Sequence, residues 1–373
     1  MSSPNKTRVL VVDDSAIVRR ALSQVLSQDP EIEVVGTACD PYVARDKILE
    51  LRPDVLTLDI EMPRMDGLTF LKILQQHHPL PVVIISSITP ACSRVAMAAL
   101  EAGAVDVIAK PTSAWSLGDL RDQLPMRVKG AARARLNHLP ALVHAEREGN
   151  VKAADFHPRQ LIVIGASTGG TEALKRVLTR LPDGLPPICI VQHIPPMFSR
   201  AFAERLNDAC AFEVREAAQG DVLSPGLTLV APGDYHMSVA FDGAGYRVRL
   251  DQNPPLHHTR PAVDVLFNSA AQAAGHYATA VLLTGMGCDG AQGMQALKLK
   301  GAMTIAQDEP TCVVYGMPRA AVELGVVDEQ FPLDRIPQAI LRAAQSRGHG
   351  APPAHPAAVP AAGRPTLQTV KPV

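Results

Sequence analysis

Two long stretches of the chain alternate short apolar runs with segments that have the spacing of amphipathic helices. In the first stretch, residues 8 to 125, five runs have the length and β-branched character of strands, from residues 9–12 to residues 105–108. Between them, apolar residues recur at positions i, i+4 and i+7, as Val18, Leu22 and Val25 do. These alternations predict a flavodoxin-like domain with a doubly wound, five-stranded parallel sheet.

The second stretch, residues 159 to 345, repeats this alternation. Its apolar runs at residues 161–164, 188–191 and 280–283 are uninterrupted, as in strands that are buried on both faces of a parallel sheet. Residues 213 to 250 contain several short strand-like runs without helices between them. We therefore expect a second α/β domain, doubly wound and Rossmann-like, with an antiparallel insertion at one end of its sheet.

The regions outside these stretches lack such patterns. Residues 126 to 158 mix basic residues with Ala, Asn and Gly and contain no strand-like run, which predicts a linker. Residues 346 to 373 are rich in Pro, Ala and Gly, so we expect a disordered tail.

Composition excludes several classes of function. A formal net charge of -1 and 4% aromatic residues argue against nucleic-acid binding. The six cysteines are widely spaced and form no C-x-x-C pair, which argues against a zinc site or a disulfide framework and fits a reducing cytoplasm. We see no signal peptide and no apolar stretch near the roughly 20 residues that span a bilayer, so we expect a cytoplasmic protein without membrane insertion. Nothing in the sequence suggests an obligate dimer, and we expect a monomer.

Acidic residues gather at the predicted carboxyl edge of the first sheet. Asp13 and Asp14 follow its first strand, and Asp59 ends its third. Clustered carboxylates repel one another unless a cation lies among them, and Mg²⁺ prefers oxygen ligands. We therefore predict that Asp59 accepts a phosphoryl group while Asp13, Asp14 and Asp59, with the backbone carbonyl of Glu61, hold Mg²⁺.

Two further residues at this edge suit a phosphoryl group. Ser86 ends the fourth strand and Lys110 follows the fifth, so they are placed to hydrogen-bond a phosphoryl oxygen and to neutralise its charge. Each position taken alone is equally compatible with a structural role, such as capping of the first helix near Ser15.

Three motifs in this stretch make the phosphoryl-acceptor interpretation more specific: V-V-D-D-S, L-D-I-E-M-P-R-M-D-G and A-K-P. At these separations they closely resemble the receiver domain of two-component response regulators. The resemblance implies phosphorylation of Asp59 by a histidine kinase. Val107 departs from the family, since many receivers carry an aromatic residue three positions before the lysine.

A glycine-rich hexapeptide, residues 165–170, opens the second stretch and allows three interpretations. Its first five residues fit the G-x-S-x-G turn that exposes a nucleophilic serine, here Ser167. A glycine-rich turn between a strand and a helix also suits phosphate binding. The glycines can equally serve close packing, with Ser167 or Thr168 capping the helix.

The next strands favour the nucleophile. A dinucleotide-binding fold requires an acidic residue after its second strand, where this chain has Gln192 and His193. Asp289 follows the strand at residues 280–283, so hydroxyl, imidazole and carboxylate meet at one sheet edge. As a structural alternative, Asp289 caps the segment after Gly290.

Other histidines and the order of the candidates bear on this hypothesis. His236, His257 and His258 are rival bases by composition, but none follows a clear parallel strand. The order Ser, His, Asp differs from the Ser, Asp, His order of α/β-hydrolases, so that fold is not implied.

Six longer motifs follow one another along the second stretch: I-G-A-S-T-G-G-T-E-A-L, V-Q-H-I, A-P-G-D-Y-H-M, R-P-A-V-D-V-L-F, L-T-G-M-G-C-D-G and Q-D-E-P-T-C-V-V-Y-G-M-P-R. They closely resemble the catalytic domain of the chemotaxis protein-glutamate methylesterase family. The resemblance implies Ser167 as nucleophile, His193 as base and Asp289 as its orienting carboxylate. It also implies backbone oxyanion donors near Thr168 and Met286.

The combined resemblance implies a phosphorylation-activated esterase. It would release methanol from glutamate methyl esters on chemoreceptors and deamidate receptor glutamines, with no cofactor in its catalytic half. The unphosphorylated receiver is expected to pack over the active site. The alternative is a response regulator whose second domain binds a ligand or partner without catalysis, in which case Ser167→Ala would preserve its output.

Overall fold

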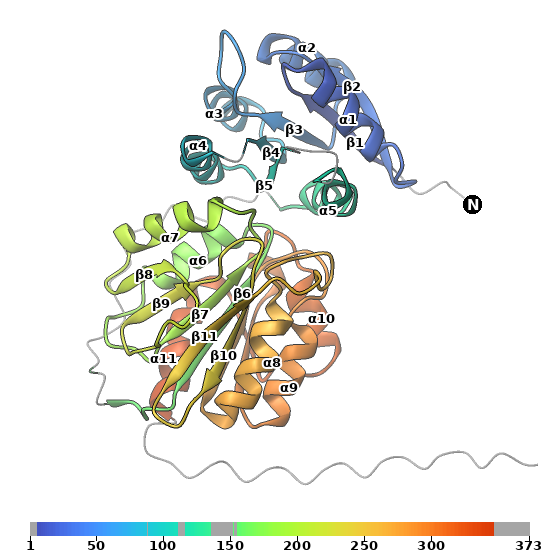
Figure 1. Ribbon diagram of the computed structural model, residues 1–373. Coiled ribbons are helices and arrows are strands. Elements are labelled where there is room, and N and C mark those ends of the chain that lie inside the picture. The colour runs from blue at the N-terminus through green and yellow to red at the C-terminus, as the bar shows by residue number, and fades with distance from the viewer. Residues whose placement is uncertain (1–5, 88, 111–115, 136–151, 153–154, 347–373) are drawn as a thin grey trace, which may run out of the picture.

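The computed structural model describes residues 6–346 except 88, 111–115, 136–151 and 153–154, and shows two α/β domains stacked on one another (Figure 1). The predicted tail from residue 347 onward and most of the predicted linker lie outside the described residues. Within the described part, no helix is long and apolar enough to cross a membrane.

The N-terminal domain has the predicted five-stranded parallel sheet, in the order β2-β1-β3-β4-β5. Its strands are β1 (Thr7–Val12), β2 (Ile32–Ala38), β3 (Val55–Asp59), β4 (Val82–Ser86) and β5 (Asp106–Ala109). Its helices are α1 (Ala16–Leu26), α2 (Pro41–Leu51), α3 (Gly67–His77), α4 (Pro90–Glu101) and α5 (Ser116–Ala132).

Local sequence signals start the first four helices of this domain. The side chains of Ser15, Asp40, Asp66 and Thr89 each accept a backbone N–H from the first turn of α1, α2, α3 or α4. Such caps satisfy N–H groups that have no partner within the helix. The alternation of β and α elements therefore arises from strand-like apolar runs that are each followed by a capped helix.

Helix α5 crosses the predicted domain boundary at residue 125 and continues to Ala132. Pro125 lies inside this helix, although a proline there has no N–H to donate to the helix. Leu124, Val128 and Ala131 join the core of the N-terminal domain, and burial of these residues extends the helix past the proline.

The C-terminal domain has a seven-stranded sheet in the order β14-β13-β12-β6-β7-β9-β8 and a separate pair, β10-β11. Its strands are β6 (Leu161–Ala166), β7 (Ile188–Gln192), β8 (Glu213–Glu216), β9 (Leu227–Val230), β10 (His236–Phe241), β11 (Tyr246–Asp251), β12 (Ala278–Leu282), β13 (Met303–Gln307) and β14 (Glu329–Phe331). Its helices are α6 (Gly170–Leu178), α7 (Phe198–Ala209), α8 (Val263–Ala273), α9 (Ala291–Leu299), α10 (Met317–Glu323) and α11 (Ile336–Ser346). Short 3₁₀ helices within the described residues include η2 (Gly275–Tyr277), η3 (Glu309–Thr311) and η4 (Leu333–Arg335).

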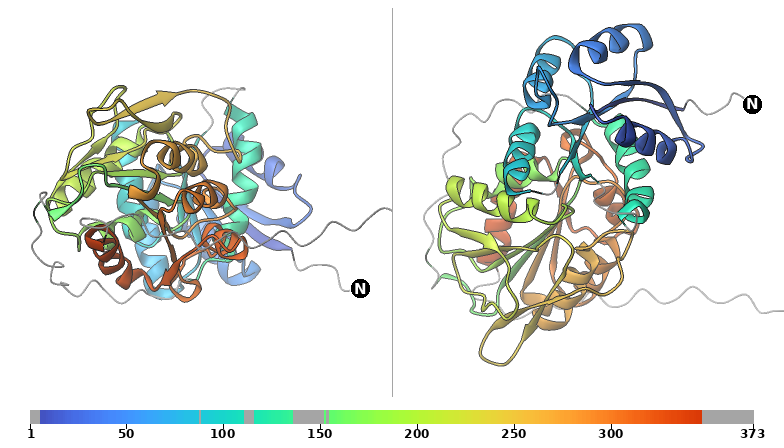
Figure 2. Two further views of the ribbon diagram at one scale, coloured as in Figure 1. Left: turned by 90° about the horizontal axis from the view of Figure 1, so that it is seen from below. Right: turned by 45° about the horizontal axis from the view of Figure 1, so that its top comes forward.

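Helices cover both faces of this sheet, as the two views of Figure 2 also show. Alternate residues of β6 enter different cores: Leu161 and Val163 pack with α8, α9 and α10, whereas Ile162 and Ile164 pack with α6, α7 and α11. This two-sided burial confirms the predicted doubly wound arrangement.

The predicted antiparallel insertion is confirmed for β10 and β11, which form an antiparallel pair. The strands β8 and β9 differ from the expectation, since both join the main sheet in parallel next to β7. All four residues of β9 are buried, which is typical of a strand inside a parallel sheet.

The N-terminal domain packs on the C-terminal domain through α4, β5 and α5 (Figure 1). Met97 and Leu100 of α4 lie against Phe202 and Leu206 of α7, so one hydrophobic cluster runs across the interface. At its rim, Glu101 forms ion pairs with Lys175 and with Arg205 of the other domain. The carboxyl end of β6, where Ser167 follows, lies under this interface.

Candidate active site

Ser167 occupies a tight turn between β6 and α6. Gly169 adopts a left-handed conformation with φ of 75°, and the Gly170 N–H donates to the Ser167 carbonyl at 2.7 Å. A Cβ at Gly170 would lie 2.1 Å from the Gln192 side chain, so the turn can approach the next strand only with glycine there. The turn presents Ser167, which is 7% exposed, at the carboxyl edge of the sheet.

His193 follows β7 and bridges the serine and a carboxylate. Its Nδ1 lies 3.1 Å from Ser167 Oγ, and its Nε2 lies 2.8 Å from Asp289 Oδ2. Because Asp289 can only accept when ionised, the imidazole proton belongs on Nε2, and Nδ1 then accepts the Ser167 hydroxyl proton. The three residues that the strand ends predicted therefore form a continuous hydrogen-bonded chain, which is the geometry of an activated nucleophile.

Asp289 is held by the N-terminus of α8. Its carboxylate accepts the backbone N–H groups of Val263 at 2.7 Å and Asp264 at 2.9 Å. Burial raises the pKa of Asp289, but the bonds from His193 and from these N–H groups outweigh burial and hold the pKa below its usual value. The structural alternative is not observed, because the Asp289 carboxylate accepts N–H groups of α8, and the N-cap residue of α9, Gly290, gives no side-chain cap.

The rival histidines have other partners. The ring of His236 accepts the Ala262 N–H at 3.2 Å and lies 3.2 Å from the Pro254 carbonyl, so it ties two loop segments together. His257 Nε2 lies 2.9 Å from Asp264 Oδ2. The backbone carbonyl of His258 accepts a bond from Gln123 of α5 in the other domain, at 3.3 Å.

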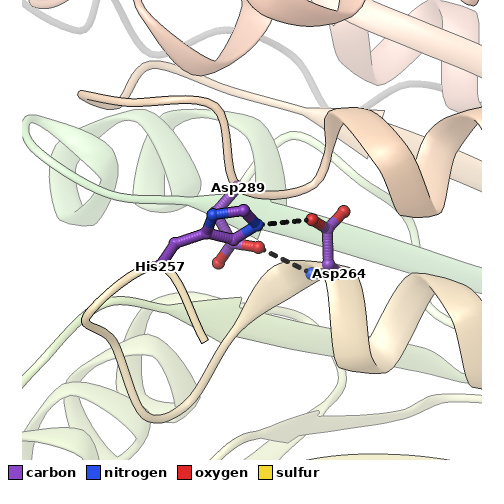
Figure 3. Close-up of side chains that lie close together, drawn as sticks. All are labelled: His257, Asp264 and Asp289. Atoms are coloured by element: carbon purple, nitrogen blue, oxygen red, sulfur yellow. Dashed lines mark hydrogen bonds and ion pairs between the residues drawn. The ribbon is translucent and has the colours of Figure 1, made fainter. Parts of the chain in front are cut away.

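His257, Asp264 and Asp289 lie close enough together to suggest a metal site (Figure 3). Their carboxylate oxygens, however, already accept bonds from His193, His257 and backbone N–H groups. Backbone donors that point at these oxygens stabilise negative charge and leave little room for a cation. The group is therefore a hydrogen-bonded network and not a metal centre.

The predicted oxyanion donors lie beneath the N-terminal domain. Within the described residues, neither the Thr168 N–H nor the Met286 N–H has a hydrogen-bond partner. The Thr168 hydroxyl donates to Asp106 of β5 at 2.8 Å, and a Cβ at Gly130 of α5 would lie 2.5 Å from Met286 Sδ. The N-terminal domain thus contacts both residues that are predicted to supply the oxyanion donors.

Sequence reasoning did not single out two residues beside the triad. Thr259 Oγ1 lies 3.5 Å from His193 Nε2, and Asp264 lies at the start of α8 next to Asp289. Neither residue follows a strand of the sheet, so the signal that located the triad does not apply to them.

A second cluster lies at the carboxyl edge of the N-terminal sheet. Carboxylate oxygens of Asp13, Asp14 and Asp59 lie within 4.8 Å of one another. Asp13 Oδ2 is buried without a well-aligned hydrogen bond, although Lys110 Nζ lies 3.0 Å away. Oxygen ligands with an unsatisfied buried member fit a hard divalent cation such as Mg²⁺.

Charge balance at this cluster depends on Lys110, whose Nζ lies 2.6 Å from Asp59 Oδ2. Burial raises the pKa of Asp59 to about 6, although the bond from Lys110 acts against this shift. Burial lowers the pKa of Lys110, but Asp59 and Asp13 outweigh burial and raise it. The site therefore has a buried carboxylate with a cation beside it, as a phosphoryl acceptor requires.

The remaining predicted residues surround this carboxylate. The Glu61 N–H donates to Asp59 Oδ1 at 3.1 Å, and the Glu61 side chain accepts a bond from Ser87. Ser86 is buried at the end of β4, and among the described residues its hydroxyl makes only a long bond of 3.5 Å to the Ser87 carbonyl. Val107 is buried in β5, so no aromatic ring occupies that position.

Comparison with known proteins gives two family matches along the chain. The model of the response regulator receiver domain matches residues 9–120. The model of the CheB methylesterase domain matches residues 162–340. Each match falls on one of the two domains seen in the structure.

Curated relatives match nearly the whole chain. A protein-glutamate methylesterase/protein-glutamine glutaminase of Syntrophus aciditrophicus (strain SB) is 52% identical over 91% of this chain and 99% of its own length. One of Anaeromyxobacter dehalogenans (strain 2CP-C) is 51% identical over 92% of this chain and 97% of its own length. Among solved structures, the Thermotoga maritima CheB methylesterase catalytic domain is 38% identical, with a TM-score of 0.48, and covers 49% of this chain and 97% of its own.

Proposed function

The chain belongs to the CheB family of protein-glutamate methylesterases/protein-glutamine glutaminases, and we propose that it hydrolyses glutamate γ-methyl esters on chemoreceptors under the control of its receiver domain. The single observation that carries this proposal is the hydrogen-bonded chain from Ser167 through His193 to Asp289. The partners that we assign are methylated chemoreceptors as substrate and a histidine kinase as phosphodonor, and we place the chain itself in the cytoplasm.

Acylation begins at Ser167. His193 Nδ1 removes the hydroxyl proton as Oγ attacks the ester carbonyl, and Asp289 stabilises the imidazolium that forms. The backbone N–H groups of Thr168 and Met286 stabilise the oxyanion, and each such donor contributes roughly 3 kcal/mol in comparable enzymes. When the tetrahedral intermediate collapses, the carbon–oxygen bond to the methoxy group breaks and His193 protonates the departing methoxy oxygen, so that methanol is released.

Deacylation uses the same residues in reverse. His193 Nδ1 takes a proton from water, the hydroxide attacks the acyl carbonyl, and Ser167 leaves with the returned proton. The product is a receptor glutamate. With a receptor glutamine, the same acyl chemistry releases ammonia instead of methanol.

The receiver site would control access. Asp13, Asp14, Asp59 and the Glu61 carbonyl would hold Mg²⁺, which supplies positive charge for transfer of a phosphoryl group to Asp59. Ser86 and Lys110 would contact the transferred phosphoryl oxygens.

The strand β5 links the two sites. Lys110 directly follows β5 and contacts the phosphoryl acceptor, while Asp106, at the other end of β5, accepts the Thr168 hydroxyl at the catalytic turn. Phosphorylation at Asp59 would draw Lys110 to a new partner, displace β5 and weaken the domain contact. The methylated receptor helices would then reach Ser167. We also propose that the receiver domain extends beyond residue 125, through the end of α5 at Ala132.

Methanol release from methylated receptor membranes tests the proposed chemistry. The wild-type chain with a small phosphodonor and Mg²⁺ is expected to release methanol, and Ser167→Ala is expected to reduce release to the uncatalysed level. A well-folded wild-type chain that releases none, or a Ser167→Ala variant that keeps its output, would favour the non-catalytic alternative.

A further inference from the structure

The N-termini of α8 and α9 in the C-terminal domain are each capped by a carboxylate that comes from the other helix or from just before it. Asp289 directly precedes Gly290 and α9, yet it accepts the N–H groups of Val263 and Asp264, the first two residues of α8. Asp264 in turn accepts the N–H of Gly293, the third residue of α9, at 2.6 Å. Neither helix has a side-chain cap from its own N-cap residue, so each N-terminus depends on the carboxylate of the other helix.

His257, on the loop between β11 and α8, adds a side-chain donor to these capping carboxylates. Its Nε2 lies 2.9 Å from Asp264 Oδ2 (Figure 3). The Asp264 side chain is 2% exposed, so without His257 a buried carboxylate oxygen would lose its side-chain donor. His257 and His258 both have left-handed backbones, with φ of 53° and 61°. Such strain persists only where surrounding contacts fix it, and the bond to Asp264 is one of these contacts.

The carboxylates of Asp264 and Asp289 repel each other, so they need hydrogen-bond donors to remain this close together. Burial raises the pKa of Asp264 and the charge of Asp289 raises it further, while the Gly293 N–H and His257 oppose the shift. The arrangement places two Asp–His pairs on either side of the first turn of α8, His193 with Asp289 and His257 with Asp264. Only the first pair touches Ser167.

We propose that Asp264 and His257 are positioning residues of the esterase: they fix the N-termini of α8 and α9, and through them the carboxylate that orients His193. This inference rests on the proposed function for its kinetic test. It assigns a role to the aspartate of the R-P-A-V-D-V-L-F motif, which lies outside the triad. The motif provides the first turn of α8 and the carboxylate that α9 requires.

Kinetics of the full chain with phosphodonor and Mg²⁺ test the proposal. His257→Ala should lower kcat for methanol release about fivefold to thirtyfold, the range expected when one buried hydrogen bond to a carboxylate is lost, and should leave KM within about twofold. His257→Gln places an amide nitrogen near the position of Nε2 and should restore kcat to within about threefold. Asp264→Ala should lower kcat at least as much as His257→Ala. The matched control is Asn253→Ala on the same loop, where only backbone groups of Asn253 make hydrogen bonds among the described residues, and it should stay within about twofold.

A spectroscopic readout separates positioning from general damage. In proton NMR spectra, the proton between His193 Nε2 and Asp289 should give a low-field signal in the wild type and in Asn253→Ala. In His257→Ala this signal should shift or broaden. If circular dichroism shows that Asp264→Ala does not fold, His257→Ala carries the test alone.

Several outcomes would overturn the proposal. They are an unchanged kcat in folded His257→Ala, a change in KM alone, an equal loss in Asn253→Ala, or no rescue by His257→Gln. If the wild type releases no methanol, the proposed function fails. The NMR comparison then decides the positioning role by itself, since an unaltered His193 signal in His257→Ala would overturn it.

Discussion

Glu101 offers the most direct way to loosen the contact between the two domains without touching either site. Its carboxylate pairs with Lys175 at 2.7 Å and with Arg205, and all three side chains are about one third exposed. Ion pairs at this exposure contribute about 0.5 to 1 kcal/mol each after solvent screening. Glu101→Gln keeps the shape of the side chain and removes both pairs, so it should weaken the contact by about 1 to 2 kcal/mol.

That loss corresponds to about a fivefold to thirtyfold increase in the population with separated domains. We expect methanol release by the unphosphorylated Glu101→Gln chain to rise by this factor, up to the rate of the phosphorylated wild type, which should itself stay unchanged. Glu204→Gln is the matched control, because in the described part of the chain Glu204 pairs only with Arg200, on the exposed side of α7. The reasoning fails if basal release by folded Glu101→Gln equals that of the wild type, or if Glu204→Gln raises release as much.

Three further changes test the account at single residues. Asp289→Asn should lower kcat by about 10³ to 10⁴, measured as methanol release, because the imidazole would favour the wrong tautomer; a loss below tenfold would contradict the role of Asp289. Gly285→Ala places a Cβ 2.7 Å from Ser167 Cβ and should reduce kcat about a hundredfold, whereas Gly245→Ala, with nothing within 4 Å, should not. In metal-free buffer at pH 7.5, Asp59→Asn should raise the free energy of unfolding of the receiver by roughly 1 to 3 kcal/mol, because the folded pKa of about 6 lies above the usual 3.8. Below both the folded and the unfolded pKa, Asp59 of the wild type is protonated, so the gain in stability of Asp59→Asn should arise between about pH 4 and 6 and vanish below pH 4. Denaturant unfolding should therefore show a smaller difference between wild type and Asp59→Asn at pH 3.5 than at pH 7.5, and an equal difference would contradict the reasoning.

The triad could be located from sequence because one physical rule covers its members. Ser167, His193 and Asp289 each follow a fully buried run, and parallel strands bring their carboxyl ends to one edge. The same rule located Asp13, Asp59 and Lys110 in the other sheet.

Other features depend on tertiary contacts that leave no local pattern. Asp264 belongs to the first turn of a helix, and its significance appears only when α9 packs beside it. Strand β8 has one buried and three more exposed positions, a pattern that fits both a parallel and an antiparallel edge strand. Its burial pattern therefore does not predict the parallel pairing with β9 that the structure shows. Helix α5 continues past Pro125, where Leu124, Val128 and Ala131 are buried and Arg127 forms a buried ion pair with Asp106 of β5, a partner 21 positions earlier in the sequence.

The central claim is that Ser167 performs the chemistry and Asp59 controls it within one chain. The measurement that tests it most directly is methanol release from methylated receptor membranes, with and without phosphodonor and Mg²⁺, for the wild type, Ser167→Ala and Asp59→Ala. The account predicts release that requires Ser167 and that rises with phosphodonor only when Asp59 is present. Release that persists in Ser167→Ala, or that rises equally with phosphodonor in Asp59→Ala, would contradict it.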